Sequence, residues 1–238
     1  MIDFSHVSYD YDGVAALDDV SLSVGPERFV SLIGPSGCGK STLLRLAAGL
    51  LAMQRGELRT DPVAYQPQKD ALMPWQRVVA NAALGSEIAG VPKAQARRAA
   101  VEHLDRFGLA GFARAWPHQL SGGMRQRLAL LRTFLTPRST LLLDEPFGAL
   151  DALTRRDLYG WLEDVWSADR RTVLLVTHDI DEALVLSDAI VVLSPRPARV
   201  VASFEVTTAR PRRGADLDDA THRALKRQVL AALSSDSR

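Results

Sequence analysis

The chain has 238 residues, of which 47% are apolar and 24% charged, as is typical of one large α/β domain with a small satellite. Its 29 basic and 28 acidic residues nearly balance, which excludes the strongly basic surface of a protein whose main partner is nucleic acid. No apolar stretch approaches the roughly 18 residues that a membrane helix needs, and the first residues do not resemble a signal peptide, so we expect a cytoplasmic protein.

The N-terminal part of the chain is predicted to form strands that lead into a phosphate-binding loop. Residues 2–9 and 21–33 have the composition of strands, and residues 11–13 indicate a turn. The glycine-rich run that follows fits the pattern G-x-x-x-x-G-K-[ST], which requires a preceding strand. This run is Gly34-Pro35-Ser36-Gly37-Cys38-Gly39-Lys40-Ser41-Thr42.

The residues of this loop predict a nucleoside triphosphate bound with Mg²⁺. Its glycines let the backbone curl round phosphates, Lys40 is expected to reach the β- and γ-phosphates, and the Ser41 hydroxyl is expected to bind Mg²⁺. We expect Thr42 to reach the α-phosphate. A strand-to-helix turn without a ligand is the alternative. The single cysteine, Cys38, excludes an intramolecular disulfide and fits a reducing compartment, and alkylating it is expected to block ATP.

Two glutamines follow a short apolar strand that starts at Val63. They are Gln66 and Gln68, and the residues alone leave open which of them is functional. Residues 72–136 are then predicted to be mainly helical, since apolar positions recur at helical spacing between glycines and prolines.

A second glycine turn lies near the end of this helical stretch. It is Leu120-Ser121-Gly122-Gly123-Met124-Arg125-Gln126-Arg127. Met124, Leu128, Leu131 and Leu135 recur at helical spacing, so the turn opens a helix whose first backbone N–H groups face an anion. The chain is therefore predicted to carry two phosphate sites.

A short buried strand over residues 140–143 ends in two acids, Asp144 and Glu145. Ligands of open α/β sheets bind beyond the carboxyl ends of the strands, so we expect both acids beside Lys40 and Ser41. Asp144 is expected to hold Mg²⁺, directly or through water, and Glu145 to orient and deprotonate the attacking water. The alternative is a solvated pair of acids at a strand end.

The rest of the chain is predicted to complete the α/β core. An amphipathic helix contains Leu158 and Leu162, and strands are expected over residues 172–177, 189–193 and 199–206. A helix is expected over 180–186 and another over 218–233. His178 follows a strand, where phosphates are expected. The arginine clusters are expected to be solvated; they are Arg97-Arg98, Arg155-Arg156, Arg170-Arg171 and residues 210–213.

Together these motifs resemble those of the ATP-binding cassette (ABC) proteins, over nearly the whole chain. Residues 34–42 resemble the family's Walker A motif, 120–127 its signature motif, 141–145 its Walker B motif and 148–151 its D-loop, and His178 matches its switch histidine. The resemblance implies an α/β fold: a P-loop NTPase core with a mixed sheet, an N-terminal antiparallel β subdomain and a helical subdomain that carries the signature.

The same resemblance implies one ABC ATPase domain over residues 1–238. The core and the β subdomain are expected over about 1–71 and 137–238, and the helical subdomain over about 72–136. In this family the Q-loop glutamine lies six residues before a proline, and Pro74 selects Gln68, which is expected to touch Mg²⁺ or the water. Tyr11 stands where members place an aromatic that stacks on adenine; Tyr9, or no stacking at all, is the alternative.

The resemblance also implies a head-to-tail homodimer in the ATP-bound state. Ser121, Gly122 and Gly123 are then expected to contact the γ-phosphate held by the other copy, and Asp151 to align the opposite site. His178 is expected to form a hydrogen bond to the γ-phosphate. Closing the site in this way excludes water and surrounds the triphosphate with donors.

Partners are implied as well. Leu72, Met73 and Trp75 either pack inside the helical subdomain or remain exposed, and the resemblance favours docking of a membrane permease on residues 68–75. An extracytoplasmic solute-binding protein is then an indirect partner, and the protein is expected at the cytoplasmic face of the cell membrane.

Within the family, the segments 72–75, 116–119 and 147–155 are similar to those of the nitrate, sulfonate and taurine importers, a group that includes importers of thiamine-precursor pyrimidines, which we slightly favour. The main alternative is a non-transport ABC ATPase of DNA repair or translation. Repair-type members carry a coiled coil between the two glycine turns, for which this chain is too short, and translation-type members usually carry two cassettes. A P-loop small-molecule kinase would not need the second turn.

Overall fold

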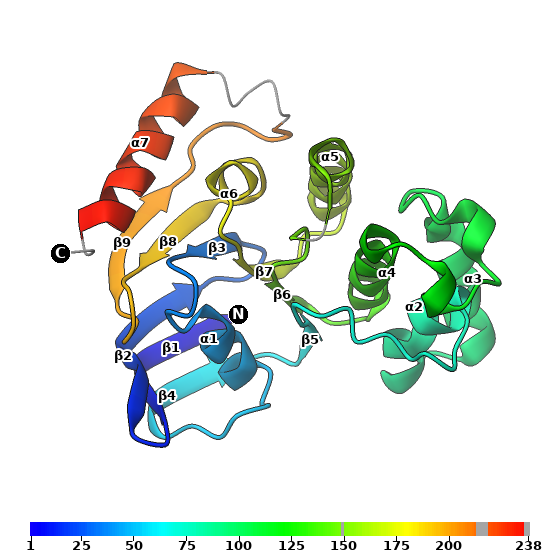
Figure 1. Ribbon diagram of the computed structural model, residues 1–238, viewed down its shortest axis with the longest axis horizontal. Helices are drawn as coiled ribbons and strands as arrows, with labels where there is room; N and C mark the ends of the chain where they lie inside the picture. Colours follow the sequence, from blue (N-terminus) through cyan, green and yellow to red (C-terminus); the bar gives the residue numbers. More distant parts are fainter. Residues whose placement is uncertain (149, 213–218, 236–238) are drawn as a thin grey trace.

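A computed structural model describes residues 1–148, 150–212 and 219–235 of the chain (Figure 1). The N-terminal part is a three-stranded antiparallel sheet in the order β2-β1-β4. β1 (Ile2–Tyr11) and β2 (Val14–Val24) are joined by Asp12 and Gly13, whose φ angles of 51° and 83° suit a tight two-residue hairpin turn. β4 (Arg55–Thr60) pairs with the other edge of β1.

The centre of the molecule is a six-stranded sheet in the order β5-β6-β7-β3-β8-β9. Its strands are β3 (Phe29–Ile33), β5 (Val63–Gln66), β6 (Thr140–Asp144), β7 (Thr172–Val176), β8 (Ala189–Leu193) and β9 (Val200–Glu205). Only β9 is antiparallel to its neighbour. Every residue of β3, β6, β7 and β8 is buried, as expected of parallel strands covered on both faces. The carboxyl ends of β6, β7 and β3 therefore meet at one edge.

α1 (Lys40–Ala47) lies between the two sheets. Leu43 and Leu44 of this helix pack in one hydrophobic core with Phe4 of β1 and Leu174 of β7. Gly49, with a φ of 68°, ends the helix. Because the helix is anchored on both sides, the loop that precedes it is held at the edge where β3 ends.

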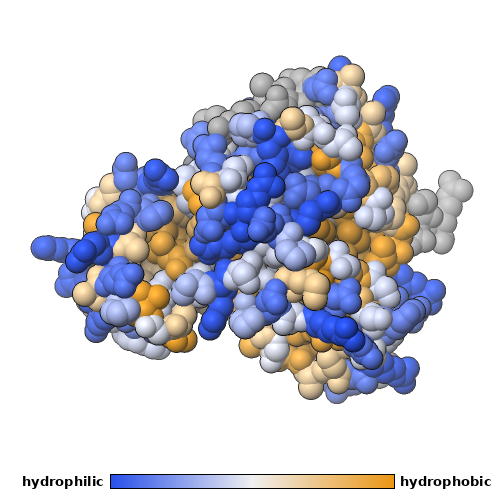
Figure 2. Space-filling model, turned by 180° about the vertical axis from the view of Figure 1, so that it is seen from behind, coloured by the Kyte–Doolittle hydropathy of each residue, from blue (hydrophilic) through white to orange (hydrophobic). Residues whose placement is uncertain are grey.

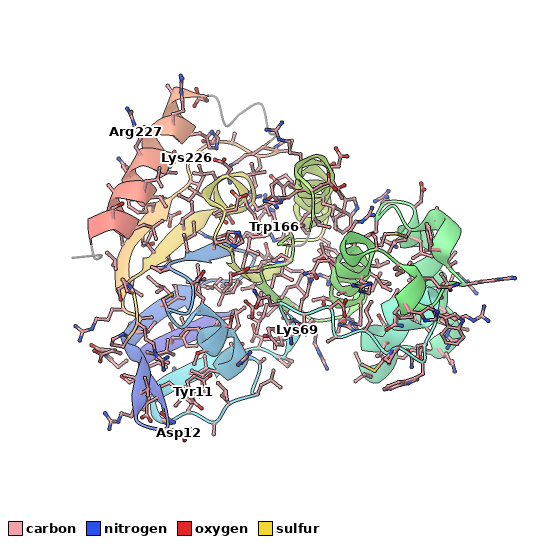
Figure 3. The ribbon with its side chains drawn as sticks, in the orientation of Figure 1. Tyr11, Asp12, Lys69, Trp166, Lys226 and Arg227 are labelled. Atoms are coloured by element: carbon pink, nitrogen blue, oxygen red, sulfur yellow. The ribbon has the colours of Figure 1, made fainter. Side chains whose placement is uncertain are left out.

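Helices cover the opposite face of the central sheet. α5 (Ala152–Ala168) and α6 (Ile180–Leu186) pack on that face, and α7 (Ala220–Ser235) packs against β8, β9 and α6. Trp166 of α5 is buried against Phe29 of β3, with the ring centroids 5.9 Å apart (Figure 3). Among the described residues, none of the helices has the length and apolar character needed to cross a membrane.

The remaining helices form a separate lobe, here called the helical lobe. It contains α2 (Val78–Ile88), α3 (Lys93–Leu104) and α4 (Gly122–Leu135), with short 3₁₀ turns at Ala110–Phe112 and Pro117–Gln119. The lobe lies to one side of the sheets in Figure 1 and stands out from the main body in Figure 2. The mixed sheet, the N-terminal antiparallel sheet and the helical lobe confirm the expected fold class.

The helix predicted to start at residue 72 starts only at Val78. Pro74 disfavours helical backbone at the residue before it and lacks an N–H donor. The buried amide of Asn81 instead holds the loop, since its Oδ1 accepts from the N–H of Met73 at 2.7 Å and its Nδ2 donates to the carbonyl of Gln76 at 2.8 Å. Tertiary hydrogen bonds thus replace the helical ones.

The prediction that the arginine clusters are solvated is wrong for part of them. Arg212 is 2% exposed and donates to the carbonyls of Val206 and Ser187. Arg210 pairs with Glu163 of α5 and Asp188, and lies 4.2 Å from the ring centroid of Trp166. These arginines fasten the segment after β9 onto α5 and the end of α6. Arg213 lies outside the described residues.

Candidate active site

The phosphate-binding loop borders a cavity of about 310 Å³ beyond the carboxyl end of β3. The loop residues in the cavity wall are Ser36, Gly37, Gly39, Lys40, Ser41 and Thr42. Gln68 and Glu145 also line it. The cavity thus lies where open α/β sheets bind their ligands, and it collects residues from several segments that are distant in the sequence.

Two glycines allow the loop to pack closely against its neighbours. Gly39 has a φ of 128°, and a Cβ there would stand 2.8 Å from the carbonyl oxygen of Ala16. A Cβ on Gly34 would stand 3.0 Å from the carbonyl oxygen of Leu193. Any side chain at either position would therefore displace the loop from β2 or from β8.

Lys40 places its ammonium group within the curve of this loop. The residue is 5% exposed, and its Nζ donates to the carbonyl of Gly34 at 2.7 Å and to that of Pro35 at 2.9 Å. An ammonium group carries three donors and no acceptor. A buried positive charge at the cavity wall is therefore available to phosphate oxygens.

Ser41, Asp144 and Tyr65 form a group of oxygen atoms beside the loop. The hydroxyl of Ser41 donates to Oδ1 of Asp144 at 3.0 Å, and the hydroxyl of Tyr65 donates to Oδ2 at 3.3 Å. Burial raises the pKa of Asp144 above its ordinary value, and the two hydrogen bonds oppose this. Hydroxyl and carboxylate oxygens are the ligands that Mg²⁺ prefers, so the residues present fit this ion. Tyr65, from β5, has no local sequence signal.

Glu145 lies at the centre of a second polar group. Its Oε2 accepts a hydrogen bond from Nε2 of Gln68 at 3.3 Å and lies 3.3 Å from Nδ1 of His178. Its backbone has a φ of 47°, a strained conformation that functional sites often contain. The N–H of Glu145 donates to the carbonyl of Val176, which extends the pairing of β6 with β7 by one residue. Three segments distant in sequence thus bring Gln68, Glu145 and His178 together.

The structure separates the two candidate glutamines. Gln66 is fully buried at the end of β5, and neither atom of its side-chain amide has a hydrogen-bond partner among the described residues. Gln68, two residues further on, faces the cavity and contacts Glu145. The structure thus places Gln68, and not Gln66, at the cavity.

Tyr11 lines the cavity at the tip of the β1–β2 hairpin (Figure 3). Its hydroxyl lies 3.3 Å from Oγ1 of Thr42, while Tyr9 packs edge-on behind it at 4.9 Å and joins the hydrophobic core. Arg196, from the loop after β8, lines the same cavity and donates to the carbonyls of Ala15 and Val14. Sequence reasoning missed Arg196, because only the fold brings its loop to the hairpin.

The second glycine turn does not line this cavity in the single chain. Ser121 caps α4, since its hydroxyl accepts from the N–H of Met124 at 3.2 Å, and both Ser121 and Gly122 are exposed. Gly123 is half-buried. Asp151 is exposed and caps α5 through the N–H of Thr154. These groups are therefore open to a second molecule; Ala149 of the expected D-loop lies outside the described residues.

Comparison with known proteins identifies the family to which these motifs belong. Residues 17–148 match the family described as ABC transporter. The chain belongs to this family. As an ABC-type ATPase it hydrolyses ATP to ADP and phosphate, which confirms the expected enzyme class.

Curated relatives and solved structures extend the comparison of this ABC ATPase. It is 45% identical to the taurine import ATP-binding protein TauB of Rhizobium johnstonii over 83% of this chain and 79% of the relative. It is 40% identical to an uncharacterized ABC transporter ATP-binding protein of Methanocaldococcus jannaschii, over 94% and 90% of the two chains. The dimeric structure of MJ0796, a bacterial ABC transporter cassette, aligns with a TM-score of 0.79 and 28% identity, over 88% of this chain and 100% of that one. A post-hydrolysis dimer of the same cassette, bound to ADP and Pi, aligns with the same score.

Proposed function

We propose that this ABC ATPase powers the import of a small solute through a separate membrane permease, by ATP-driven closure of two copies head to tail. The observation that carries the proposal is the convergence of Lys40, Glu145 and Gln68 on one cavity, with His178 beside Glu145 and with Ser121 exposed on another part of the chain. The phosphate-binding loop thus supplies contacts within one copy, whereas Ser121 and Gly122 are exposed and can contact a second copy.

Each residue at the cavity has a role in this proposal. Lys40 binds the β- and γ-phosphates, and Glu145 orients a water molecule for in-line attack and accepts its proton. His178 donates a hydrogen bond to the γ-phosphate. Gln68, bonded to Glu145, keeps that carboxylate turned toward the water.

The metal site and the adenine site complete the nucleotide-binding surface. Ser41, Asp144 and Gln68 would hold Mg²⁺, which when bound neutralises charge on the phosphate oxygens. Tyr11 stacks on the adenine, since its ring lines the cavity at the hairpin tip. The backbone N–H groups of the loop hold the phosphates, as at other phosphate-binding helix starts.

Two copies are proposed to share each site. The glycine turn Ser121-Gly122-Gly123 of one copy binds the γ-phosphate held by the other, and Asp151 aligns the opposite site. The similarity to a dimeric cassette supports this arrangement.

We also propose that the chain divides into two parts. The core with the β subdomain covers about 1–71 and 137–238, and the helical subdomain covers about 72–136.

The permease is proposed to dock beside residues 68–75, at the cytoplasmic face of the membrane, and a solute-binding protein acts on its other side. Trp75 is 70% exposed in this segment, which supports a contact there. For the solute we propose a sulfonate-type anion such as taurine, because the relative TauB carries that name. The pyrimidine favoured by the sequence segments has no further support.

The general-base role of Glu145 is tested by the variant Glu145→Gln. Turnover should fall about 10²–10⁴-fold while MgATP still binds, because only the proton acceptor is lost. The variant should then accumulate an ATP-bound dimer, measured by size-exclusion chromatography, and adding Ser121→Ala should weaken that dimer. Glu57→Gln, an exposed acid on β4, is the matched control. Near-normal turnover of Glu145→Gln would overturn the assignment.

Transport is tested separately by co-purification from detergent-solubilised membranes. The chain should copurify with a multi-helix permease, and the solute that raises ATPase activity in the reconstituted assembly should be a sulfonate rather than a pyrimidine. A chain that instead purifies as an RNA-bound monomer would contradict the import function.

A further inference from the structure

Both sequence neighbours of His178 are tied to α5. Thr177 donates through Oγ1 to Oε2 of Glu182 at 2.9 Å, and the hydroxyl of Tyr159 donates to the same oxygen at 3.4 Å. Asp179 accepts through Oδ2 from the guanidinium of Arg155 at 3.0 Å. We call the four residues Arg155, Tyr159, Asp179 and Glu182 the α5–α6 ladder. Arg155 and Tyr159 are one helical turn apart, so the contacts that they make with Asp179 and Glu182 follow one another along α5.

The same two α5 side chains also contact the segment that carries Glu145 and Asp151. The second terminal nitrogen of Arg155 donates to the carbonyl of Leu150 at 3.0 Å. The ring of Tyr159 packs edge-on against Phe147, with the centroids 5.0 Å apart. The ladder therefore joins the segment 145–151 to both neighbours of His178.

The ladder is built to hold this geometry. Tyr159 is 7% exposed and Glu182 3%, so the hydrogen bonds that they make lie in a low dielectric, while Oε1 of Glu182 and Nε of Arg155 are buried with no hydrogen-bond partner among the described residues. Asp179 also caps α6, since its Oδ1 accepts from the N–H groups of Asp181 and Glu182. A shift of Asp179 therefore moves α6 and His178 together.

The guanidinium fork of Arg155 makes two contacts that a lysine cannot reproduce. One terminal nitrogen holds the carboxylate of Asp179 and the other holds the carbonyl of Leu150. The planar fork holds both contacts at once because its two terminal nitrogens are fixed apart in one plane, whereas the donors of an ammonium group all radiate from a single nitrogen on a flexible stem. The bridge between the two segments thus depends on arginine rather than on positive charge.

We propose that Arg155 and Tyr159 are positioning residues for hydrolysis. They hold His178 in its place beside Glu145, and they transmit a displacement of Asp151 to His178. This inference rests on the proposed function, because the displacement comes from a second copy of the chain that contacts Asp151. The ladder then makes turnover in one site depend on the closure of the other.

The first test compares Arg155→Lys and Tyr159→Phe with the unaltered chain. Each variant should lower kcat about tenfold while KM for ATP changes less than about twofold, as expected when a catalytic group is misplaced rather than binding lost. The Hill coefficient for ATP should fall toward about 1, because coupling between sites is lost. Tyr159→Phe keeps the ring against Phe147 and removes only the hydroxyl.

The second test asks whether the ladder acts through His178. In a His178→Ala background, Arg155→Lys should change the rate less than about twofold, since residues that act as a unit are not additive. Because the chain with His178→Ala should hydrolyse ATP slowly, its rate is measured by single-turnover hydrolysis of radiolabelled ATP. A further tenfold loss in that background would overturn the proposal, because it would show that Arg155 acts independently of His178.

A matched control removes a comparable ion pair elsewhere. Arg97→Met breaks the pair with Glu87 in the helical lobe, at 3.2 Å, and should leave kcat and the Hill coefficient unchanged. Thermal unfolding by circular dichroism checks that every variant is folded. If Arg155→Lys proves unstable, Tyr159→Phe alone carries both tests.

The two proposals fail in different ways. If the unaltered chain hydrolyses ATP and Glu145→Gln abolishes this, the proposed chemistry holds. If both ladder variants then match Arg97→Met in kcat and in Hill coefficient, the positioning role is wrong. If Glu145→Gln retains its turnover, the proposed chemistry fails whatever the ladder variants do.

Discussion

Cys38 lies at the base of the phosphate-binding loop, 1% exposed, with its Sγ 4.0 Å from Nζ of Lys40. Burial raises the pKa of the thiol above its ordinary value, although the positive charge of Lys40 opposes this. Because the thiolate is the reactive form, the side chain is both shielded and protonated near neutral pH. The sequence alone predicts that alkylating Cys38 blocks ATP, whereas its surroundings make the thiol slow to react.

We therefore predict slow alkylation of Cys38 in the folded chain. Reaction with iodoacetamide at pH 7.5 should be roughly tenfold or more slower than in urea, where the thiol is exposed. The rate should rise as the pH increases toward the raised pKa. Mass spectrometry of samples quenched over time measures the modified fraction, and equal rates in the folded and unfolded chain would contradict the prediction.

At the scale of elements, the segment after β9 is held by a buried ion pair in addition to the apolar packing of Val206. Arg210 is paired with Glu163, whose side chain is 1% exposed, and also donates to the carbonyl of Leu186 at the end of α6. Removing one partner of a buried pair leaves an uncompensated charge. The attachment of this segment should therefore depend on both charges.

We predict that Arg210→Met lowers the free energy of unfolding by about 3–5 kcal/mol. Adding Glu163→Gln should recover part of this loss, because the unpaired charge is then removed. Arg199→Met, which breaks an exposed pair with Asp18, should cost less than about 1 kcal/mol. Urea unfolding followed by circular dichroism measures all four chains. Equal effects of Arg210→Met and Arg199→Met would refute the role of burial.

The packing of α5 on α6 should also make stability depend on pH. Burial raises the pKa of Glu182 to about 8, with Asp179 raising it further, while Arg155 and the hydrogen bonds from Thr177 and Tyr159 oppose this. In the unfolded chain this carboxyl has its ordinary pKa of 4.5. Between these two values the folded state keeps a proton that the unfolded state has lost. The contribution of Glu182 to the free energy of unfolding therefore falls as the pH rises from 4.5 to about 8, and it changes little above about 8.

We predict that Glu182→Gln removes this dependence. One proton contributes a slope of about 1.4 kcal/mol per pH unit. The free energy of unfolding of the variant should therefore rise relative to that of the unaltered chain at each step from about pH 5.5 to about pH 7.5. Urea unfolding at three pH values measures the difference. Stability curves that run parallel in both chains would show that Glu182 is ionised in the folded state.

At the scale of the whole molecule, the loop that leads from Gln68 to the helical lobe presents an exposed apolar side chain. Trp75 is exposed, whereas Leu72 packs against the hydrophobic core and Met73 is half-buried. The loop that carries them is held by Asn81 and leads back to Gln68, which contacts Glu145. A partner that binds at Trp75 is thus one short loop away from the carboxylate of Glu145.

We predict that Trp75→Glu prevents copurification with the permease without changing thermal unfolding, because an exposed apolar contact is lost and no packing is disturbed. Val101→Glu, which alters an exposed apolar residue on α3, is the matched control and should leave assembly intact. Pull-down from solubilised membranes measures assembly. Unchanged copurification of Trp75→Glu would place the docking surface elsewhere.

The amino-acid sequence by itself determined the features that depend on neighbours along the chain. The strand at Ala189–Leu193 and the helix at Ile180–Leu186 have the predicted bounds, because apolar runs and helix caps are local signals. The phosphate-binding loop is predictable for the same reason, since its glycines and Lys40 lie within one short run of the chain.

Only the tertiary structure decided what depends on distant segments. It brought Arg196 to the hairpin and Tyr65 to Asp144, paired Arg210 with Glu163, buried Arg212, and moved the start of the predicted helix to Val78. The reason is physical. Desolvation and hydrogen-bond pairing are set by whichever element packs alongside, and nothing in the local pattern of a charged or aromatic residue records which element that is.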